Sequence, residues 1–321
     1  MQNAATPLKG KGSTMTVLST QMRWTAEAME ARIVRYADMR PCYNAFIDTR
    51  TPGSEAKENF TIIGPGVSEN PEQYVHIAEP HGFNIGGARQ PPGCVNSQHS
   101  HDTAEVFVVH TGIWRFDLGE HGDDAQVVLH PGDVISLPTQ MFRGFTNVGD
   151  DTGYLFAVLG GDDPGRVLWA PGVFDMAAEH GLVLLESGQL IDTTAGQAVP
   201  DGAPTMPRTS AEQVAALHRS NARDAERLVW RATSGAGVTA IIGQSAPLDW
   251  PHPFTLDRMD AVSDRVTPTA PEVLFVHAGA LTVSWASGAL TLSAGDTMTV
   301  PVGLERTLAG DAVVYRVSGT G

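Results

Sequence analysis

The chain has 321 residues, 42% of them hydrophobic and 18% charged, a composition typical of a folded globular protein rather than a disordered one. Lysine and arginine number 21 against 36 aspartates and glutamates, which gives a formal net charge of −15. This balance argues against a nucleic-acid partner, because phosphate binding requires concentrated positive charge. No apolar run reaches the roughly 20 residues that span a bilayer, so we expect no membrane partner. Cys42 and Cys94, the two cysteines, lie far apart in sequence, which favours a reducing cytoplasm.

Taken in chain order, the sequence begins with a polar segment that has no apolar core, and we expect a disordered arm over residues 1–24. Apolar residues at helical spacing predict a helix over residues 25–40, capped by Thr25 and ended by Pro41. From Asn59 the pattern changes to short β-branched or aromatic runs between glycines and prolines, which is typical of an antiparallel sandwich or barrel. The predicted strands are 60–63, 75–77, 83–85, 105–109, 114–118, 127–129, 134–137 and 154–159.

Helical signals interrupt this strand pattern only after Pro171. A helical turn is predicted over residues 173–180, a polar linker over 192–208, and a short helix over 210–218 with Ser210 as its cap. The strand pattern returns beyond Arg227 and lasts to the end of the chain. We therefore expect an N-terminal domain over residues 25–190, a linker with a short helix over 191–226, and a C-terminal domain over 227–321.

Three side chains that bind metals, His99, His101 and Glu105, fall within seven residues of one another. In a β-strand alternate residues share a face, so His99 and His101 should point the same way and Ser100 the other. Two imidazoles and a carboxylate suit iron, manganese, nickel, copper or zinc. The alternative is three solvated polar residues in a loop. Only eleven histidines are present in the chain, so this clustering favours a metal site in the N-terminal half.

The sequence also repeats itself. The segment 105–112, EVFVVHTG, is matched by 272–279, EVLFVHAG, with glutamate, histidine and glycine in one register. Downstream, each copy has a Gly-Asp pair, then a proline, then an arginine at the same spacing: Gly132, Asp133, Pro138 and Arg143, against Gly295, Asp296, Pro301 and Arg306. The sequence therefore predicts two copies of one β unit.

These residues resemble the cupin superfamily, and the repeat resembles a bicupin. The first cupin motif is met by Gly93, His99, His101, Glu105 and Gly112. The second is met by Gly132, Pro138 and Asn147, but Gln140 stands where a glycine is usual and Arg143 where a histidine is expected as fourth metal ligand. The resemblance implies a mainly β protein of two tandem jelly-roll barrels with a few short helices, and a metal inside a barrel.

The C-terminal copy departs further from the motif. Val266 and Pro268 occupy the positions of the two histidines, and neither side chain can bind a metal. Glu272 alone makes no site. We therefore expect a structural or assembly role for the C-terminal barrel and assign the metal to His99, His101 and Glu105.

Arg143 has two interpretations. It either binds the anionic end of a substrate and orients it toward the metal, or pairs with Glu105 in a metal-free core. A third possibility is that another histidine, such as His81, completes the ligand set. His110 has the opposite strand parity from Glu105, so we expect it to point away from the metal face and to be structural.

The leading hypothesis is a cytoplasmic metal-dependent dioxygenase with Fe(2+), or else Mn, Ni or Zn, acting on a small aromatic or enolisable carbonyl substrate, with Arg143 as the catalytic residue. A non-oxidative isomerase or hydrolase that uses the metal as a Lewis acid is the alternative. A ligand-binding cupin without catalysis is another. The expected partners are an anionic small molecule and further copies of the chain, since bicupins often form homo-oligomers.

Overall fold

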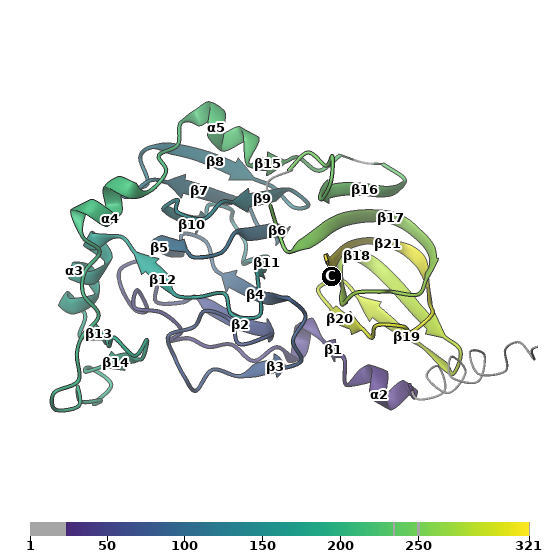
Figure 1. The fold of residues 1–321 in the computed structure, drawn as a ribbon, viewed down its shortest axis with the longest axis horizontal. Coiled ribbons are helices and arrows are strands. Elements are labelled where there is room, and N and C mark those ends of the chain that lie inside the picture. The colour runs from purple at the N-terminus through teal and green to yellow at the C-terminus, as the bar shows by residue number, and fades with distance from the viewer. Residues whose placement is uncertain (1–23, 234, 249–250, 321) are drawn as a thin grey trace, which may run out of the picture.

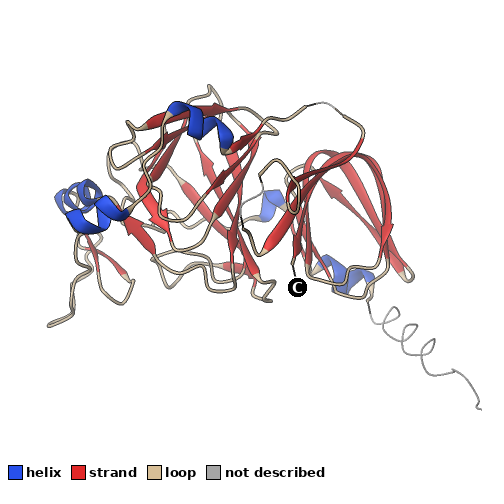
Figure 2. Cartoon of the chain, turned by 45° about the horizontal axis from the view of Figure 1, so that its top comes forward, coloured by secondary structure: helices blue, strands red, loops and turns tan. Residues whose placement is uncertain are grey.

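Two β-barrels lie side by side in the computed structural model, which describes residues 24–233, 235–248 and 251–320 (Figure 1). The expectation of a mainly β chain with two jelly-roll barrels and a few short helices is confirmed (Figure 2). The expected arm over residues 1–24 lies outside the described residues, apart from Trp24. Within these ranges no helix has the length and apolar character needed to cross a membrane.

The N-terminal barrel is made of two facing sheets, and all eight strands predicted for this half are present. In spatial order, the first sheet contains β12 (Val167–Trp169), β5 (Val95–His101), β10 (Arg143–Asn147), β7 (Trp114–Leu118) and β8 (Ala125–Leu129). The second contains β15 (Val229–Trp230), β9 (Val134–Leu137), β6 (Glu105–Thr111), β11 (Gly153–Gly160), β4 (Phe83–Gln90), β2 (Glu58–Ile63) and β3 (Val75–Ile77). The pairs are antiparallel except β2 with β3, which is parallel.

A small helical layer covers the outer end of this barrel, on the side away from the second barrel (Figure 1). Its helices are α3 (Pro171–Glu179) and α4 (Ala211–Ala216), and between them the chain forms the strand pair β13 (Leu182–Leu184) and β14 (Leu190–Asp192). Both predicted helices are confirmed. Ser210 caps α4 as expected, because its hydroxyl accepts from the Gln213 backbone N–H and the Gln213 side chain accepts from the Ser210 N–H.

The C-terminal barrel is built mainly from three strands of thirteen or fourteen residues. Its spatial order is β1 (Ile33–Val34), β20 (Thr297–Val300), β18 (Glu272–Trp285), β21 (Arg306–Gly319), β17 (Phe254–Val266) and β16 (Gly237–Ile242), with β19 (Gly288–Ser293) paired to β18. The long strands contain bulges, where the register shifts. Bulges bend a strand, which lets one strand pass from one side of the barrel to the other.

The helix predicted over residues 25–40 is wrong beyond its first turns. The structure has α2 (Ala26–Glu30), then β1, then a 3₁₀ turn η1 (Tyr36–Asp38). Thr25 caps α2 as predicted, since its hydroxyl accepts from the Ala28 N–H at 3.1 Å. The β-branched residues Ile33 and Val34 pair with β20 instead of continuing the helix. The edge of a sheet far along the chain therefore overrides the local helical pattern.

Each barrel receives a short arm from the other half of the chain. β1 follows α2 and joins the C-terminal sheet, whereas β15 follows α5 (Ala222–Arg227) and joins the N-terminal sheet. The purple α2 accordingly lies beneath the yellow barrel in Figure 1. The sheets therefore divide the chain differently from the expected ranges 25–190 and 227–321.

Matching ion pairs hold the two arms. Arg35, just after β1, donates to Asp296 at 2.8 Å, and Arg231, just after β15, donates to Asp133 at 3.0 Å. Each aspartate belongs to the repeated Gly-Asp pair and also accepts a backbone N–H from the arm, from Tyr36 at 3.0 Å and Ala232 at 2.8 Å respectively. The internal repeat thus extends to the arms, and the Gly-Asp pair anchors them.

The two barrels share one hydrophobic core. On β6, Val106, Val108 and His110 face the C-terminal barrel, while Glu105, Phe107 and Val109 face the interior of their own barrel. At the contact, the ring of Phe156 on β11 stacks on that of Phe275 on β18, with centroids 4.3 Å apart. Burial of this face makes the two barrels a single body.

Two histidines meet in this shared core. The rings of His110 and His277, equivalent residues of the repeat, lie 5.4 Å apart, and Nδ1 of each is buried with no hydrogen-bond partner among the described residues. Burial lowers the pKa of both to about 4, and His277 adds to the effect on His110. Arg258 lowers and Asp260 raises the pKa of His277. His110 points away from the metal face, as its strand parity predicted.

We expect this histidine pair to make the chain sensitive to acid. In the unfolded chain a histidine takes up a proton near pH 6.5, whereas in the fold each stays neutral down to about pH 4. The contribution of these neutral histidines to the free energy of unfolding is therefore fully present above pH 6.5. It declines as the pH falls towards 4, by roughly 3 kcal/mol for each histidine. Thermal unfolding across this window should show a steeper fall of Tm in the wild type than in His110→Phe,His277→Phe. Parallel curves for the two proteins would contradict the prediction.

Candidate metal centre

His99, His101 and Glu105 meet where the two sheets of the N-terminal barrel come together. β5 carries the two histidines on one face, with their ring centroids 5.0 Å apart, and a short turn then leads to Glu105 at the start of β6. The three side chains are buried, and one ligand atom of each lies within 4.8 Å of the other two. The structure thus brings together all three residues predicted from the sequence.

Both imidazoles are neutral, which is the form that binds metals. Nδ1 of His99 lies 2.7 Å from the Ser97 carbonyl oxygen and donates to it, so that Nε2 is left with a free lone pair. Burial, with a further contribution from Arg143, lowers the pKa of His99 to about 3. Burial likewise lowers the pKa of His101, with contributions from Arg143 and His99. Neither ring becomes charged at physiological pH.

The spacing of these donors fits a small divalent ion. Nε2 of His101 lies 3.6 Å from Oε2 of Glu105, which is too long for a hydrogen bond. The same separation suits two ligands that each lie about 2.1 Å from one ion. Nδ1 of His101 has no partner among the described residues. Burial raises the pKa of Glu105, and the neighbouring Arg143 opposes that shift.

Arg143 lies behind Glu105 rather than in the cavity. Its Nη2 donates to Oε2 of Glu105 at 2.9 Å, its Nη1 donates to the Met141 carbonyl oxygen at 3.2 Å, and the side chain is fully buried. Antiparallel pairing of β10 with β5 sets Arg143 directly opposite His99. The ion pair considered from the sequence is therefore present, next to the three candidate ligands.

The second barrel shows what such a pair looks like without histidines. Arg306 binds Glu272 with two hydrogen bonds, of 2.9 and 2.7 Å, and Asp264 with a third, of 2.7 Å. Arg143 makes a single bond to Glu105, and its Nε has no partner among the described residues. Arg143 thus bonds only Oε2 of Glu105, the oxygen that also lies 3.6 Å from Nε2 of His101. The glutamate–arginine pair is common to both barrels, whereas the histidines distinguish the N-terminal one.

A cavity of about 80 Å³, partly open to solvent, reaches the three candidate ligands. Phe145 and Trp169 line it, whereas Trp114, Phe116 and Phe142 are packed in hydrophobic cores. The other lining residues come mainly from β2, β4 and the loops before β2 and β3.

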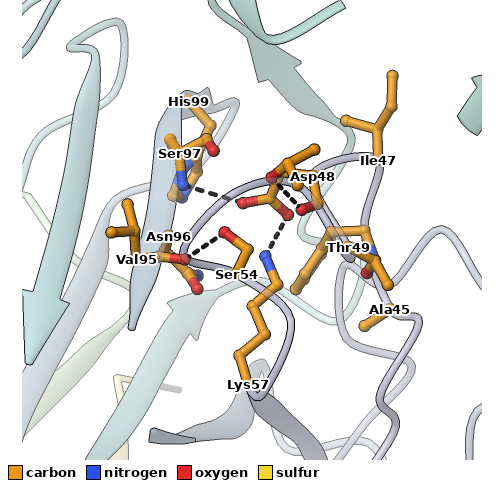
Figure 3. A network of polar contacts seen from close by, with 12 residues as sticks. Ala45, Ile47, Asp48, Thr49, Ser54, Lys57, Val95, Asn96, Ser97 and His99 are labelled. Atoms are coloured by element: carbon orange, nitrogen blue, oxygen red, sulfur yellow. Dashed lines mark hydrogen bonds and ion pairs between the residues drawn. The ribbon is translucent and has the colours of Figure 1, made fainter. Parts of the chain in front are cut away.

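A buried ion pair supports the strand that carries His99 (Figure 3). Lys57 and Asp48, both inaccessible to solvent, are paired through Nζ and Oδ1, and Oδ2 of Asp48 accepts from the Ser97 backbone N–H at 2.9 Å. The Ser97 carbonyl in turn accepts from His99. The pair therefore holds the backbone of Ser97, whose carbonyl oxygen orients the His99 ring. No pattern in the sequence indicates this ion pair, because both residues lie in an irregular segment.

The hydrogen bond from Ser97 to Asp48 can be tested with two matched variants. Asp48→Asn,Lys57→Met removes the charges but keeps an oxygen acceptor, while Asp48→Leu,Lys57→Met removes the acceptor as well. We expect the leucine variant to bind Zn²⁺ about tenfold more weakly than the asparagine variant, because partners of a metal-binding histidine typically contribute 10–100-fold to affinity. Competition titrations against a zinc chelator measure the difference. Equal dissociation constants would remove Asp48 from the support of His99.

Glu69 ties a loop to the wall of the cavity. Its carboxylate accepts from Nε1 of Trp169 at 2.7 Å and from the Ile47 backbone N–H at 2.6 Å. Burial raises its pKa to about 8, although both hydrogen bonds oppose this shift. The Trp169 ring packs on His99, with centroids 5.4 Å apart. Glu69 thus helps to position the aromatic wall beside His99, another role without a sequence signal.

His81, considered as a further ligand, does not join the cluster. It is absent from the residues that line the cavity, and its Nδ1 lies 2.6 Å from the Glu79 carbonyl oxygen. Its backbone N–H donates to Asp162 in the loop after β11. Cys42 and Cys94 are both free thiols, and neither lines the cavity.

Comparisons with known proteins agree with this architecture. Residues 88–159 match the family model of the cupin domain. Two Arabidopsis thaliana proteins are similar: germin-like protein subfamily 1 member 4, 27% identical over 134 residues, and member 7, 35% identical over 88 residues. These matches cover 40% and 26% of this chain. They span 60% and 38% of the relatives, so the similarity covers less than two thirds of either.

Solved structures resemble the chain over most of its length. An oxalate decarboxylase mutant from Bacillus subtilis aligns with a TM-score of 0.51 and 10% identity, covering 90% of this chain and 76% of that one. A formate complex of the Lactobacillus farciminis oxalate decarboxylase aligns with a TM-score of 0.51 and 12% identity, covering 89% and 84%. Vicilin from Capsicum annuum aligns with a TM-score of 0.50 and 13% identity, covering 90% of this chain and 85% of that one. At these identities the likeness shows the fold alone. Residues 88–159 are thus similar to a cupin domain, and the chain shares the two-barrel fold of these structures.

Proposed function

We propose that the chain is a metal-dependent oxygenase of the dioxygenase type, acting on a small aromatic or enolisable carbonyl compound in the N-terminal barrel. The observation that carries the proposal is the convergence of two neutral histidines and a buried carboxylate on the wall of a cavity. Two histidines and one carboxylate are the ligand set of non-haem iron(II) oxygenases. We therefore assign Fe(2+) as the first candidate, with Mn, Ni and Zn as alternatives.

Each residue has a role in this proposal. His99, His101 and Glu105 hold the ion, which when bound supplies electrons for reaction with dioxygen and Lewis acidity toward a substrate oxygen. Ser97 fixes the tautomer of His99 by accepting from Nδ1. Phe145 and Trp169 place an aromatic wall beside the ligands, where they exclude water from the substrate.

For Arg143 the proposal is a positioning role. The sequence suggested a catalytic arginine that grips the anionic end of the substrate, but the guanidinium is buried behind Glu105 and is absent from the cavity lining. Its hydrogen bond to Oε2 of Glu105 instead supports an orienting function, as is common for carboxylates that bind metals. Arg143→Lys should then weaken metal retention, whereas a substrate-binding role would raise KM and leave the metal in place.

Oxygen uptake by the chain, purified anaerobically and loaded with Fe(2+), tests the oxygenase proposal. A panel of phenols and β-diketones is supplied, with the His99→Ala,His101→Ala variant as control. We expect substrate-dependent oxygen consumption by the wild type alone. Turnover of a substrate without oxygen uptake would replace the proposal by a non-oxidative isomerase or hydrolase. An absence of both metal and turnover would favour the third possibility below.

A metal-free, ligand-binding cupin is the third possibility, and the Glu105–Arg143 ion pair is the observation that favours it. Such a protein would bind small molecules in the same cavity with no need for an ion.

Two free cysteines are consistent with the cytoplasmic location that we propose. We also propose that the chain forms a homo-oligomer, because bicupins often do.

A further inference from the structure

The wall of the cavity presents no cation to a ligand. Among the lining residues, all of them in the described part of the chain, there is no lysine or arginine, and Glu105 is the one carboxylate. Two nearby cations, Arg143 and Lys57, are fully buried behind the wall and are already paired with Glu105 and Asp48 respectively. When no metal ion is bound, an anionic ligand would therefore leave water without a partner for its charge, which is costly.

Most of the wall is apolar. Its aromatic residues are Phe46, Phe60, Phe107, Phe145 and Trp169. Gly86 on β4 also lines the cavity, and an added Cβ there would meet only the Phe60 carbonyl oxygen, at 3.3 Å. An aromatic or otherwise planar apolar molecule gains from burial against such rings and from edge or face contacts with them.

One side-chain amide in this wall lacks a partner. Asn59 on β2 is 8% exposed, its Nδ2 is buried without a partner, and no hydrogen bond of its side-chain amide occurs among the described residues. The other amides of the wall are bonded within the protein: Asn84 to Gly161, Asn96 to Gln90, and Gln73 to Pro65. A buried polar group without a partner is rare and requires an explanation. A ligand that accepts a hydrogen bond from Asn59 supplies one.

We infer that the cavity selects a neutral, mainly apolar aromatic ligand with one hydrogen-bond acceptor, which Asn59 binds. This departs from the anionic substrate expected from the sequence. The inference rests on the proposed function because it uses the same cavity. It concerns ligand binding alone, however, and requires no bound metal. The specificity comes from the absence of a cation and the presence of one free amide.

Isothermal titration with three ligands of similar size tests the inference. The full chain is dialysed against EDTA, so that no carboxylate binds through an ion, and is titrated with acetophenone, benzoate and ethylbenzene. Acetophenone carries a neutral acceptor, benzoate an anionic one, and ethylbenzene none. We expect acetophenone to bind at least tenfold more tightly than benzoate.

The Asn59→Leu variant provides the control. It should bind acetophenone about tenfold more weakly than the wild type does, because a buried hydrogen bond is lost, and should bind ethylbenzene unchanged. Retained binding of ethylbenzene shows that the variant cavity is intact. Benzoate binding as tight as that of acetophenone, equal weakening of acetophenone and ethylbenzene in the variant, or no binding of any ligand would each overturn the inference. Metal content and oxygen uptake are measured separately, so failure here leaves the oxygenase proposal to its own test.

Discussion

Replacing His99 and His101 together by alanine should abolish metal retention. Two of the three donors that lie within 4.8 Å of one another are then lost, and Glu105 alone, already paired with Arg143, cannot hold a divalent ion. We expect the metal content per chain, measured by mass spectrometry after anaerobic purification, to fall at least tenfold. The fold should survive, because the barrel cores consist of other residues.

A matched variant separates loss of the site from loss of histidines in general. His121→Ala,His130→Ala also removes two imidazoles, both of them exposed and outside the cavity, and should keep the full metal content. If wild type, site variant and control all carry equally little metal, the oxygenase proposal is untenable. If all three carry equal amounts of metal, the ion binds elsewhere on the chain.

The second large effect is expected in the barrel without histidines. Arg306→Met should lower the free energy of unfolding by about 3–5 kcal/mol, because it leaves the buried Glu272 carboxylate without its two hydrogen bonds and its countercharge. Urea denaturation followed by circular dichroism measures the change. The double variant Glu272→Gln,Arg306→Met should recover much of the loss, since no unpaired charge stays buried.

An exposed pair gives the control for this prediction. Arg265 and Glu305 form an ion pair on the same barrel, with side chains 70% and 47% exposed. Arg265→Met should therefore change stability by less than about 1 kcal/mol. A loss as small for Arg306→Met as for Arg265→Met would mean that the buried pair does not hold the C-terminal barrel together.

The repeat made the two-barrel architecture predictable, because period-2 runs with turn residues between them specify strands locally. The ligand cluster was predictable for the same reason: strand alternation alone puts His99 and His101 on one face. Even the turn at Gln140 follows from the sequence comparison. Gln140 adopts a φ of 59°, and its counterpart Gly303 a φ of 80°, so the position that favours glycine is left-handed in both copies.

What the sequence could not provide are the contacts between segments far apart in the chain. Ile33 and Val34 leave a helical pattern to pair with β20, which lies more than 250 residues away. The ion pair of Lys57 with Asp48 and the hydrogen bond of Glu69 with Trp169 join loops to the site, and loops carry no periodicity that would reveal them. Such partners are chosen by three-dimensional proximity rather than by local pattern.

The sequence by itself determined the fold class, the duplication, the three candidate ligands and the loss of ligands at Val266 and Pro268. Only the tertiary structure decided that Arg143 turns towards Glu105 and away from the cavity, leaving that wall without a cation. The physical reason is that strand parity fixes which face a side chain occupies. Which charged group the end of a side chain meets depends instead on how separate strands pack.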